Sequence, residues 1–519
     1  MNERKLIPRS LLRSLFRGQT GLGSGVAANI VANAIIGIAF VVSVPLILPY
    51  IGIEAYGLVG FYVAIQGIVT VLDLGLNVAI TRDFGVIGHD PANASQLRDL
   101  LRTSEIIYLG MAIAMALTWL VASRIILDWV NPSGLSEQTV YNSLLIMGVP
   151  LALQFPLSLY GGGLYGMHRQ ALVSAIGVVF SLLRNLGVIA ILHFVSASPE
   201  TYFGWNALCV GLQVPVLMLA MHSVMPLASG RSRFRFELLT RQWRFVAGIG
   251  VVTLASTLFL QVDKFVLSRI VPLETFGYYS LAATVAGGLY WLSQPVFRAL
   301  LPRLSKLVEG ADREQLITLY HQGTQLMAVV ILPISTICAA FPQQVMLLWQ
   351  RDAHLASETA PVLALLMAGG ALNAILFVPY TLQLAFGSTR IQMAMILVGL
   401  AISIPLTVLF VRGWGPPGAA AATLILNVSF LTLWVPFVHR RFIPGDGFRW
   451  TLNDVALPLA AAMIGAVAAR IAYRDTDSFL LIALQLGAAF FLTTACCVIA
   501  SSYARRWAAK LIRRYAANG

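Results

Sequence analysis

The sequence contains few charged residues. Only 11% of its 519 residues are Asp, Glu, Lys or Arg, whereas 58% are hydrophobic. Soluble domains average about 25% charged residues. A soluble fold could not bury so much apolar surface. The scarcity of charge therefore excludes a soluble globular protein and indicates an integral membrane protein.

The sequence also lacks the signatures of an enzyme. It contains no glycine-rich phosphate loop, no His/Cys cluster with metal-ligand spacing and no soluble domain that could bind a nucleotide. We therefore predict a protein that is not an enzyme, that uses no metal or cofactor, and that does not hydrolyse ATP to drive transport.

Cysteine is scarce as well. The four cysteines, Cys209, Cys338, Cys496 and Cys497, all fall in apolar stretches. Cysteines in such surroundings behave as small core side chains. We predict no structural disulfide.

Long apolar runs are abundant. A bilayer core of about 30 Å needs about 20 apolar residues for one helical crossing. Runs of this length recur along the chain and predict an all-α integral membrane protein with about fourteen transmembrane helices. The predicted crossings are residues 26–49, 57–80, 104–127, 140–160, 171–194, 203–227, 245–270, 277–300, 321–341, 359–385, 390–411, 417–438, 453–473 and 478–502.

The basic residues predict the orientation in the membrane. If the N-terminus is cytoplasmic, most of the 35 Lys and Arg residues fall in cytoplasmic segments. The positive-inside rule then places both termini in the cytoplasm. The net charge of +13 is spread over many loops, which fits contact with anionic membrane lipids and argues against nucleic acid. Residues 6–18 and the tail 503–519 predict interfacial amphipathic helices.

An internal repeat predicts two lobes. An offset of 220 residues brings Glu54 over Glu274 and Gly57 over Gly277, each after the first helix of a six-helix set. Because six is even, the two copies would have the same orientation and be related by a parallel pseudo-two-fold axis. We therefore predict an N-terminal lobe with its amphipathic segment at 1–227, a basic cytoplasmic linker at 228–244, a second lobe at 245–440, two accessory helices at 441–502 and a basic tail at 503–519.

Four stretches give the sequence a resemblance to a known family. They are YIGIEAYG at 50–57, LDLGLN at 72–77 followed by Arg82, VDKF at 262–265 with FGYYSLA at 276–282, and GWGPPGAA at 413–420. Over residues 20–440 the chain resembles polysaccharide or O-antigen (Wzx-type) flippases of the multidrug/oligosaccharidyl-lipid/polysaccharide exporter superfamily. The resemblance implies translocation of an undecaprenyl-pyrophosphate-linked oligosaccharide from the cytoplasmic to the periplasmic leaflet, for cell-surface polysaccharide synthesis. Polymerase and glycosyltransferase components of that pathway would be its partners.

Arg184 is the first candidate for binding such a substrate. It lies near the middle of the predicted fifth crossing. A central arginine costs about 2.5 to 3.5 kcal/mol to insert, so something inside the protein must compensate. A planar guanidinium suits a pyrophosphate. The alternative is a structural role, in which Arg184 pairs with helix carbonyls or with an acid of its own lobe.

The predicted seventh helix carries a polar stripe. Thr253, Thr257, Gln261 and Lys264 follow one another at helical spacing and would face a cavity, where Lys264 and Gln261 are substrate-binding candidates. The first helix offers Asn29 and Asn33 on one face. Asp263 is either a coupling-ion site or half of an ion pair that pins the helix.

Polar residues also gather near the predicted cytoplasmic mouth. Asp73 and Arg82 lie toward one end of the second helix, and Gln294 and Arg298 occupy matching positions in the eighth. We predict a polar gate in which Arg82 and Arg298 receive the pyrophosphate while Asp73 exchanges partners. The alternative is a static interfacial network with snorkelling arginines.

The mechanism we expect is alternating access around a central cationic cavity. An H⁺ or Na⁺ gradient, or substrate flux, would supply the energy. Two other functions remain open at this point: a lipid II flippase, and a cation-coupled multidrug exporter of the same superfamily.

Overall fold

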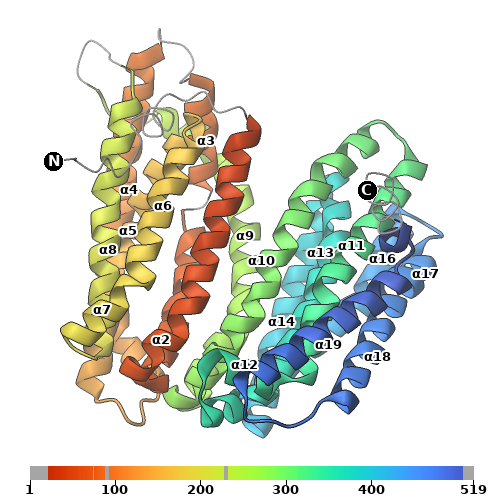
Figure 1. Ribbon diagram of the computed structural model, residues 1–519. Coiled ribbons are helices and arrows are strands. Elements are labelled where there is room, and N and C mark those ends of the chain that lie inside the picture. The colour runs from red at the N-terminus through yellow and green to blue at the C-terminus, as the bar shows by residue number, and fades with distance from the viewer. Residues whose placement is uncertain (1–21, 74, 88–92, 227–231, 236, 507–519) are drawn as a thin grey trace, which may run out of the picture. The chain divides into compact units, whose positions relative to one another are not determined.

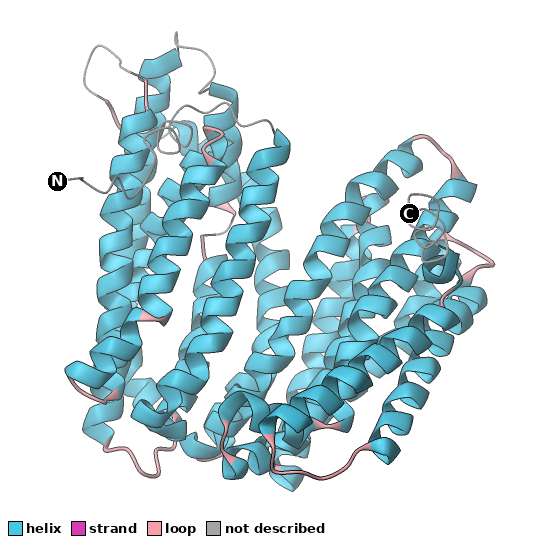
Figure 2. Ribbon diagram, in the orientation of Figure 1, coloured by secondary structure: helices cyan, strands magenta, loops and turns pink. Residues whose placement is uncertain are grey.

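The computed structural model describes residues 22–73, 75–87, 93–226, 232–235 and 237–506, with side chains left out for part of the first and ninth helices. The described residues form helices joined by loops, and no strand occurs among them (Figure 2). The all-α fold class is confirmed. The N-terminal amphipathic segment lies outside the described residues, and so do residues 507–519 of the predicted tail.

The chain divides into two compact units. The first extends as far as Leu258 and takes in Pro272–Glu274, while the second comprises Phe259–Val271 and the chain from Thr275 onward. The predicted lobe and linker boundaries stay a prediction.

The first unit is a helical bundle in which α5 is central, since α5 packs on α3, α4 and α8. The second major pairing is α2 with α6. The helices are α2(Leu22–Val71), α3(Leu76–Ile87), α4(Ala94–Trp129), α5(Glu137–Gly166), α6(Gln170–Asn185), α7(Gly187–Phe194), α8(Pro199–Val224) and the first part of α9(Glu237–Ile270) (Figure 1).

The second unit is built around α11 and α13, which pack on each other. The accessory pair α18 and α19 packs together and against α11. After α9 the elements are α10(Leu273–Glu309), α11(Arg313–Ala340), α12(Pro342–Gln350), α13(Ala353–Ala385), α14(Thr389–Trp414), α15(Pro416–Ser429), the π-helix η2(Phe430–Trp434), α16(Val435–Phe442), α17(Gly447–Arg449), the π-helix η3(Trp450–Ala456), α18(Leu457–Ala472) and α19(Phe479–Ala500).

Eleven helices within the described residues are long and apolar enough to cross a membrane. The chain is therefore a multi-pass membrane protein, while the number fourteen stays a prediction. The predicted first crossing and most of the second are merged into α2, which bends at Gly52 (φ 79°, ψ 166°). The four cysteines carry free thiols.

One predicted crossing is interrupted, contrary to the sequence-based expectation. Residues 57–80 are not one helix, because α2 ends at Val71 and a turn with Gly75 at φ 79° precedes α3. The predicted fifth crossing, 171–194, is matched by one candidate span, Gln170–Phe194, in which Leu186 separates α6 from α7 with its backbone still in the right-handed helical region. Interrupted membrane helices need polar partners for the freed backbone groups. The turn between α2 and α3 therefore marks a place where polar side chains should gather.

Candidate functional site

The turn between α2 and α3 places a carboxylate inside the first unit. Asp73 is 8% exposed. Its Oδ1 accepts the backbone N–H of Gly75 at 2.9 Å, and its Oδ2 accepts the Ser158 hydroxyl of α5 at 2.7 Å. The Tyr108 hydroxyl of α4, buried without a hydrogen-bond partner, is near enough to interact with Asp73 electrostatically. Asp73 thus supports the broken segment and links three helices.

A chain of hydrogen bonds leads from Asp73 toward the far end of α3. The Asn77 amide donates to the Ser158 hydroxyl at 2.7 Å and to the Ser158 carbonyl at 2.6 Å. The Thr81 hydroxyl donates to the Gly162 carbonyl at 3.1 Å. Only glycine allows this approach, because a Cβ at Gly162 would lie 2.9 Å from the Asn77 amide nitrogen.

Arg82 lies at the end of this network, on the exposed side. Its guanidinium pairs with Asp83 at 3.0 Å and its side chain is 58% exposed. The hydrogen bonds of Asp73 go to Ser158 and Gly75 instead. The predicted exchange of partners at a gate is untested by this arrangement and stays a prediction.

Arg184 lies in the last turn of α6, before Leu186, which separates α6 from α7. It is partly buried, and its charge acts on the Tyr62 hydroxyl of α2 and on Tyr202 and Cys209 of α8. Within the described part of the chain no acidic side chain forms an ion pair with it. No described acid therefore compensates the charge of the guanidinium, which acts on neutral polar side chains.

The polar residues of α9 have separate partners. The Lys264 ammonium donates to the Gln261 carbonyl oxygen at 2.8 Å, and Tyr279 of α10 donates a short hydrogen bond to Asp263. Neighbouring Asp263 and Lys264 therefore do not neutralise each other, and no ion pair of Asp263 occurs among the described residues. The ion-pair alternative for Asp263 finds no support here.

Asp263 opens onto a small polar cavity within the second unit. The cavity has a volume of about 70 Å³. The Asn373 amide donates to the Asn427 carbonyl oxygen at 3.3 Å across it. Side-chain oxygens on four helices suit a hydrated proton or a small hard cation. The polar lining residues are Asp263, Asn373, Ser403, Thr407, Thr423 and Asn427.

The remaining predicted residues are placed as follows. Asn33 donates to the Asn29 side-chain oxygen at 2.6 Å, along one face of α2. Gln294 is half-buried and Arg298 exposed on α10. The first unit thus holds Asn29, Asn33, Asp73, Arg82 and Arg184, and the second holds Gln261, Asp263, Lys264, Gln294 and Arg298. Their convergence on one central cavity stays a prediction.

Sequence reasoning missed several partners of these residues. It did not single out Ser158 and Tyr279, which form hydrogen bonds with Asp73 and Asp263. It also did not single out Tyr62 and Tyr202, on which the charge of Arg184 acts. Hydroxyl side chains are common in membrane helices, so composition alone gives little signal. Their position at helical spacing on the same faces as the charged residues becomes informative only once the packing is known.

Comparison with known proteins identifies the family. The sequence profile described as polysaccharide biosynthesis protein matches residues 22–308, more than half of the chain. The chain belongs to this family.

The curated relatives of the chain have low sequence identity to it, but they align over most of its length. A Shigella flexneri protein assigned to O-antigen transport is 21% identical over 387 residues, covering 74% of this chain and 90% of the relative. A Synechocystis protein assigned as the lipid II flippase MurJ is 22% identical over 389 residues, covering 71% and 72%. These relatives of the polysaccharide family are transporters and flippases rather than enzymes, as the sequence predicted for this chain.

Solved structures show which fold the family member adopts. A lipid II flippase MurJ structure superposes with a TM-score of 0.66 at 14% identity, covering 90% of this chain and 97% of that one. A multidrug resistance MATE transporter gives a TM-score of 0.59 at 15% identity, covering 80% and 94%. The chain therefore has the MurJ/MATE transporter fold, as the resemblance to that superfamily implied.

Proposed function

We propose that the chain translocates an undecaprenyl-pyrophosphate-linked oligosaccharide from the cytoplasmic to the periplasmic leaflet of a bacterial inner membrane. Membership of the polysaccharide family and the relative assigned to O-antigen transport support this substrate class. The observation that carries the proposal is Arg184, a partly buried cation that no acid neutralises in the described part of the chain. A pyrophosphate headgroup would supply the missing negative charge.

Arg184 has the surroundings of a ligand site. An unpaired charge in a membrane helix is expensive unless water or a ligand solvates it. The hydroxyls of Tyr62 and Tyr202 lie around it and can accept or donate hydrogen bonds to a phosphate or to sugar hydroxyls. Further candidates would bind the lipid-linked glycan elsewhere along its path. They are Lys264, Arg298, Gln261, Gln294, Asn29 and Asn33.

The position of Arg184 along its span gives this residue a second property. Arg184 lies in the interior of one candidate membrane span, Gln170–Phe194, rather than at either of its ends. A charge at such depth marks a substrate or ion pathway in many transporters. Alternating access, with both termini in the cytoplasm, would then carry the headgroup across.

Energy coupling would use the half-buried Asp263 and the buried Asp73. Asp263 faces a cavity of about 70 Å³, large enough for water or a small cation. Within the described residues Asp73 accepts hydrogen bonds from neutral donors, so a proton or cation could neutralise it. We propose Asp263 as the H⁺ or Na⁺ site and Asp73 as a gate or second ion site that changes partners during the cycle.

A lipid II flippase is the second candidate function. The superposition on MurJ supports it through the fold, and the Synechocystis relative supports it through the sequence. Lipid II carries the same pyrophosphate linkage, so Arg184 does not distinguish the two. A multidrug exporter is a weaker candidate, because an uncompensated arginine disfavours cationic drugs.

Mass spectrometry of lipid-linked glycans in a deletion strain tests the proposal. Accumulated undecaprenyl-pyrophosphate oligosaccharide would support it. Accumulation of lipid II alone would instead identify a peptidoglycan precursor as the substrate. If the deletion strain still exports polysaccharide and accumulates no lipid-linked glycan, both candidate functions are contradicted.

Variants of Arg184 test the observation on which the proposal rests. We expect Arg184→Ala to abolish export while the protein remains folded in the membrane. Arg184→Lys should restore export only in part, since an ammonium lacks the planar fork of the guanidinium. The matched control is Arg412→Ala, an exposed arginine in the last turn of α14. Full complementation by Arg184→Ala would end the phosphate-binding role.

A further inference from the structure

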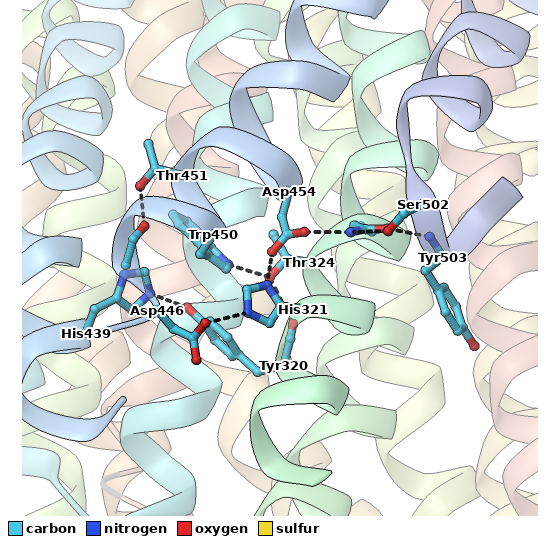
Figure 3. Close-up of polar contacts among 12 residues, drawn as sticks. Tyr320, His321, Thr324, His439, Asp446, Trp450, Thr451, Asp454, Ser502 and Tyr503 are labelled. Atoms are coloured by element: carbon cyan, nitrogen blue, oxygen red, sulfur yellow. Dashed lines mark hydrogen bonds and ion pairs between the residues drawn. The ribbon is translucent and has the colours of Figure 1, made fainter. Parts of the chain in front are cut away.

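One face of α11 binds the C-terminal part of the second unit (Figure 3). Tyr320 and His321 lie one turn before Thr324 and Gln325 on this face. Their partners come from α16, from the loop before α17, from η3 and from the residues that follow α19. Neither the predicted transport path nor the proposed ion sites use this cluster.

His321 lies at the centre of the cluster, between two carboxylates. Its Nδ1 makes a short contact with Asp454 Oδ2, and its Nε2 lies 3.5 Å from Asp446 Oδ1. The His321 side chain is 13% exposed and that of Asp454 only 1%. Figure 3 shows the ring pointing toward Asp454 on one side and Asp446 on the other.

The hydrogen-bonding capacity of imidazole decides which form fits this arrangement. A neutral ring has one N–H donor and one bare nitrogen that only accepts, whereas a carboxylate only accepts. Neutral His321 could therefore donate to Asp454 but would place a lone pair toward Asp446. The imidazolium donates from both nitrogens and carries a charge opposite to that of both neighbours. The cation is the form that satisfies the site.

The other titratable groups around His321 do not supply this charge. His439 of α16 bonds through Nε2 to the Tyr320 hydroxyl at 2.8 Å, and its Nδ1 is buried without a partner. A positive His439 would repel the His321 cation. The Arg313 guanidinium of α11 donates to the Pro444 carbonyl at 3.2 Å, beside the loop that carries Asp446. His321 is thus the cation placed directly between the two aspartates.

Asp454 transmits the state of His321 to the accessory helices. It lies in η3, directly before α18, and its Oδ1 accepts the Gln325 amide at 2.6 Å. The Gln325 oxygen in turn accepts the backbone N–H of Tyr503, after α19, at 2.8 Å. A π-helix is an irregular segment that often marks a functional position. A change at Asp454 therefore reaches both ends of the accessory pair.

We propose that His321 is a proton-binding site whose occupancy locks η3 and the accessory helices α18 and α19 onto α11. The proton joins two carboxylates from different segments into one network. When it leaves, Asp446 loses its cationic partner and the loop carrying it is released from α11. Docking is therefore tightest at acidic to neutral pH and loosens as the pH rises. This site is independent of the substrate proposed above.

Amide hydrogen exchange of the full-length protein in membranes tests this proposal. The measurement follows peptides covering residues 443–456 between about pH 6 and pH 9, corrected for the intrinsic pH dependence of exchange. Loss of the ion pair between His321 and Asp446 should reduce protection roughly tenfold across this range. His321→Gln should show lower protection that no longer changes with pH.

Asp446→Asn provides a variant that keeps the network satisfied. The amide can donate to the bare nitrogen of a neutral ring, so protection should stay high and lose its pH dependence. The matched control is His354→Gln, an exposed histidine in α13, which should keep the wild-type profile.

Results of four kinds would overturn the proposal. The first three are flat protection in the wild type, a wild-type pH profile in His321→Gln, and a wild-type pH profile in Asp446→Asn. If His321→Gln does not fold, the profile of Asp446→Asn decides. A control variant that also lost the pH dependence would show that the effect does not originate at His321.

Discussion

The carboxylate of Glu54 accepts the backbone N–H of Gly134 at 2.9 Å. The neighbouring N–H groups of Ser133 and Leu135 bind the same carboxylate at 2.6 and 2.9 Å. Three successive amides of the loop between α4 and α5 thus converge on one side chain of α2. This contact ties the loop to α2, two residues after the bend at Gly52.

Changing either member of this contact should destabilise the first unit. Glu54→Gln replaces one acceptor oxygen by an NH₂ group that cannot accept a hydrogen bond. We expect the free energy of unfolding to fall by about 1 to 3 kcal/mol. Gly134→Ala places a Cβ 2.8 Å from Glu54 Oε2 and displaces the carboxylate. Thermal unfolding of the purified protein measures both.

The double variant separates a shared mechanism from two independent ones. If both substitutions break the same contact, their effects should be clearly less than additive. Glu358→Gln, at an exposed position of α13, is the matched control and should leave the unfolding temperature unchanged. Additive effects would contradict a common origin.

The close packing of α3 on α5 predicts opposite results at two nearby glycines. A Cβ at Gly166 would lie 2.4 Å from the Thr81 carbonyl oxygen, so Gly166→Ala must push the helices apart, at a cost of about 1 to 3 kcal/mol. A Cβ at Gly161 would meet nothing within 4 Å. Gly161→Ala should be neutral or stabilising by up to about 1 kcal/mol, since alanine favours helix. Equal unfolding temperatures for the two variants would refute this packing argument.

Trp450 should contribute to the stability of the second unit through one hydrogen bond. Its buried indole N–H donates to the Thr324 hydroxyl at 2.8 Å, and its ring stacks on Tyr320 at 6.1 Å between centroids. Trp450→Phe removes the N–H donor and part of the ring. We expect the free energy of unfolding to fall by about 1 to 3 kcal/mol. Trp291→Phe, at an exposed position, is the control. Matching denaturation curves for the two variants would speak against a contribution from the buried bond.

The proposed ion site predicts a change in coupling rather than in folding. Asp263→Asn keeps the size of the side chain and the hydrogen bond from Tyr279, but removes the charge. We expect surface polysaccharide export in a complemented strain to fall and to stop responding to external pH and Na⁺. Asp475→Asn, exposed after α18, should behave as wild type. An unchanged ion response in Asp263→Asn would exclude this carboxylate as the coupling site.

The sequence predicts the class of fold well but not the interruptions in its helices. Hydropathy detects apolar length, and residues 57–80 are apolar enough to be continuous. The break depends on local backbone geometry at Gly75 and on a hydrogen bond between Asp73 and Ser158, which lies 85 residues away. Such a contact cannot be read from the pattern of a single segment.

The candidate site shows the same division. Arg184, Asp73 and Asp263 stand out in sequence because a charge inside an apolar run is rare. Their neutral partners do not stand out, because serine and tyrosine are ordinary in such runs. His321 and Asp454 lie at the predicted ends of crossings, where charge is common, so only the packing revealed their contact.

The hydrogen bond from the Tyr503 N–H to Gln325 joins residues 178 positions apart, and the later one lies close to the end of the chain. Synthesis proceeds from the N-terminus, so α11 leaves the ribosome long before Asp454 and Tyr503 exist. During that interval the polar face of α11 remains in the membrane or in the insertion machinery without Asp454 and Tyr503. The polar face of α11 is thus covered only after α19 has been synthesised, and quality-control proteases could recognise a nascent chain halted within α19 by that uncovered face.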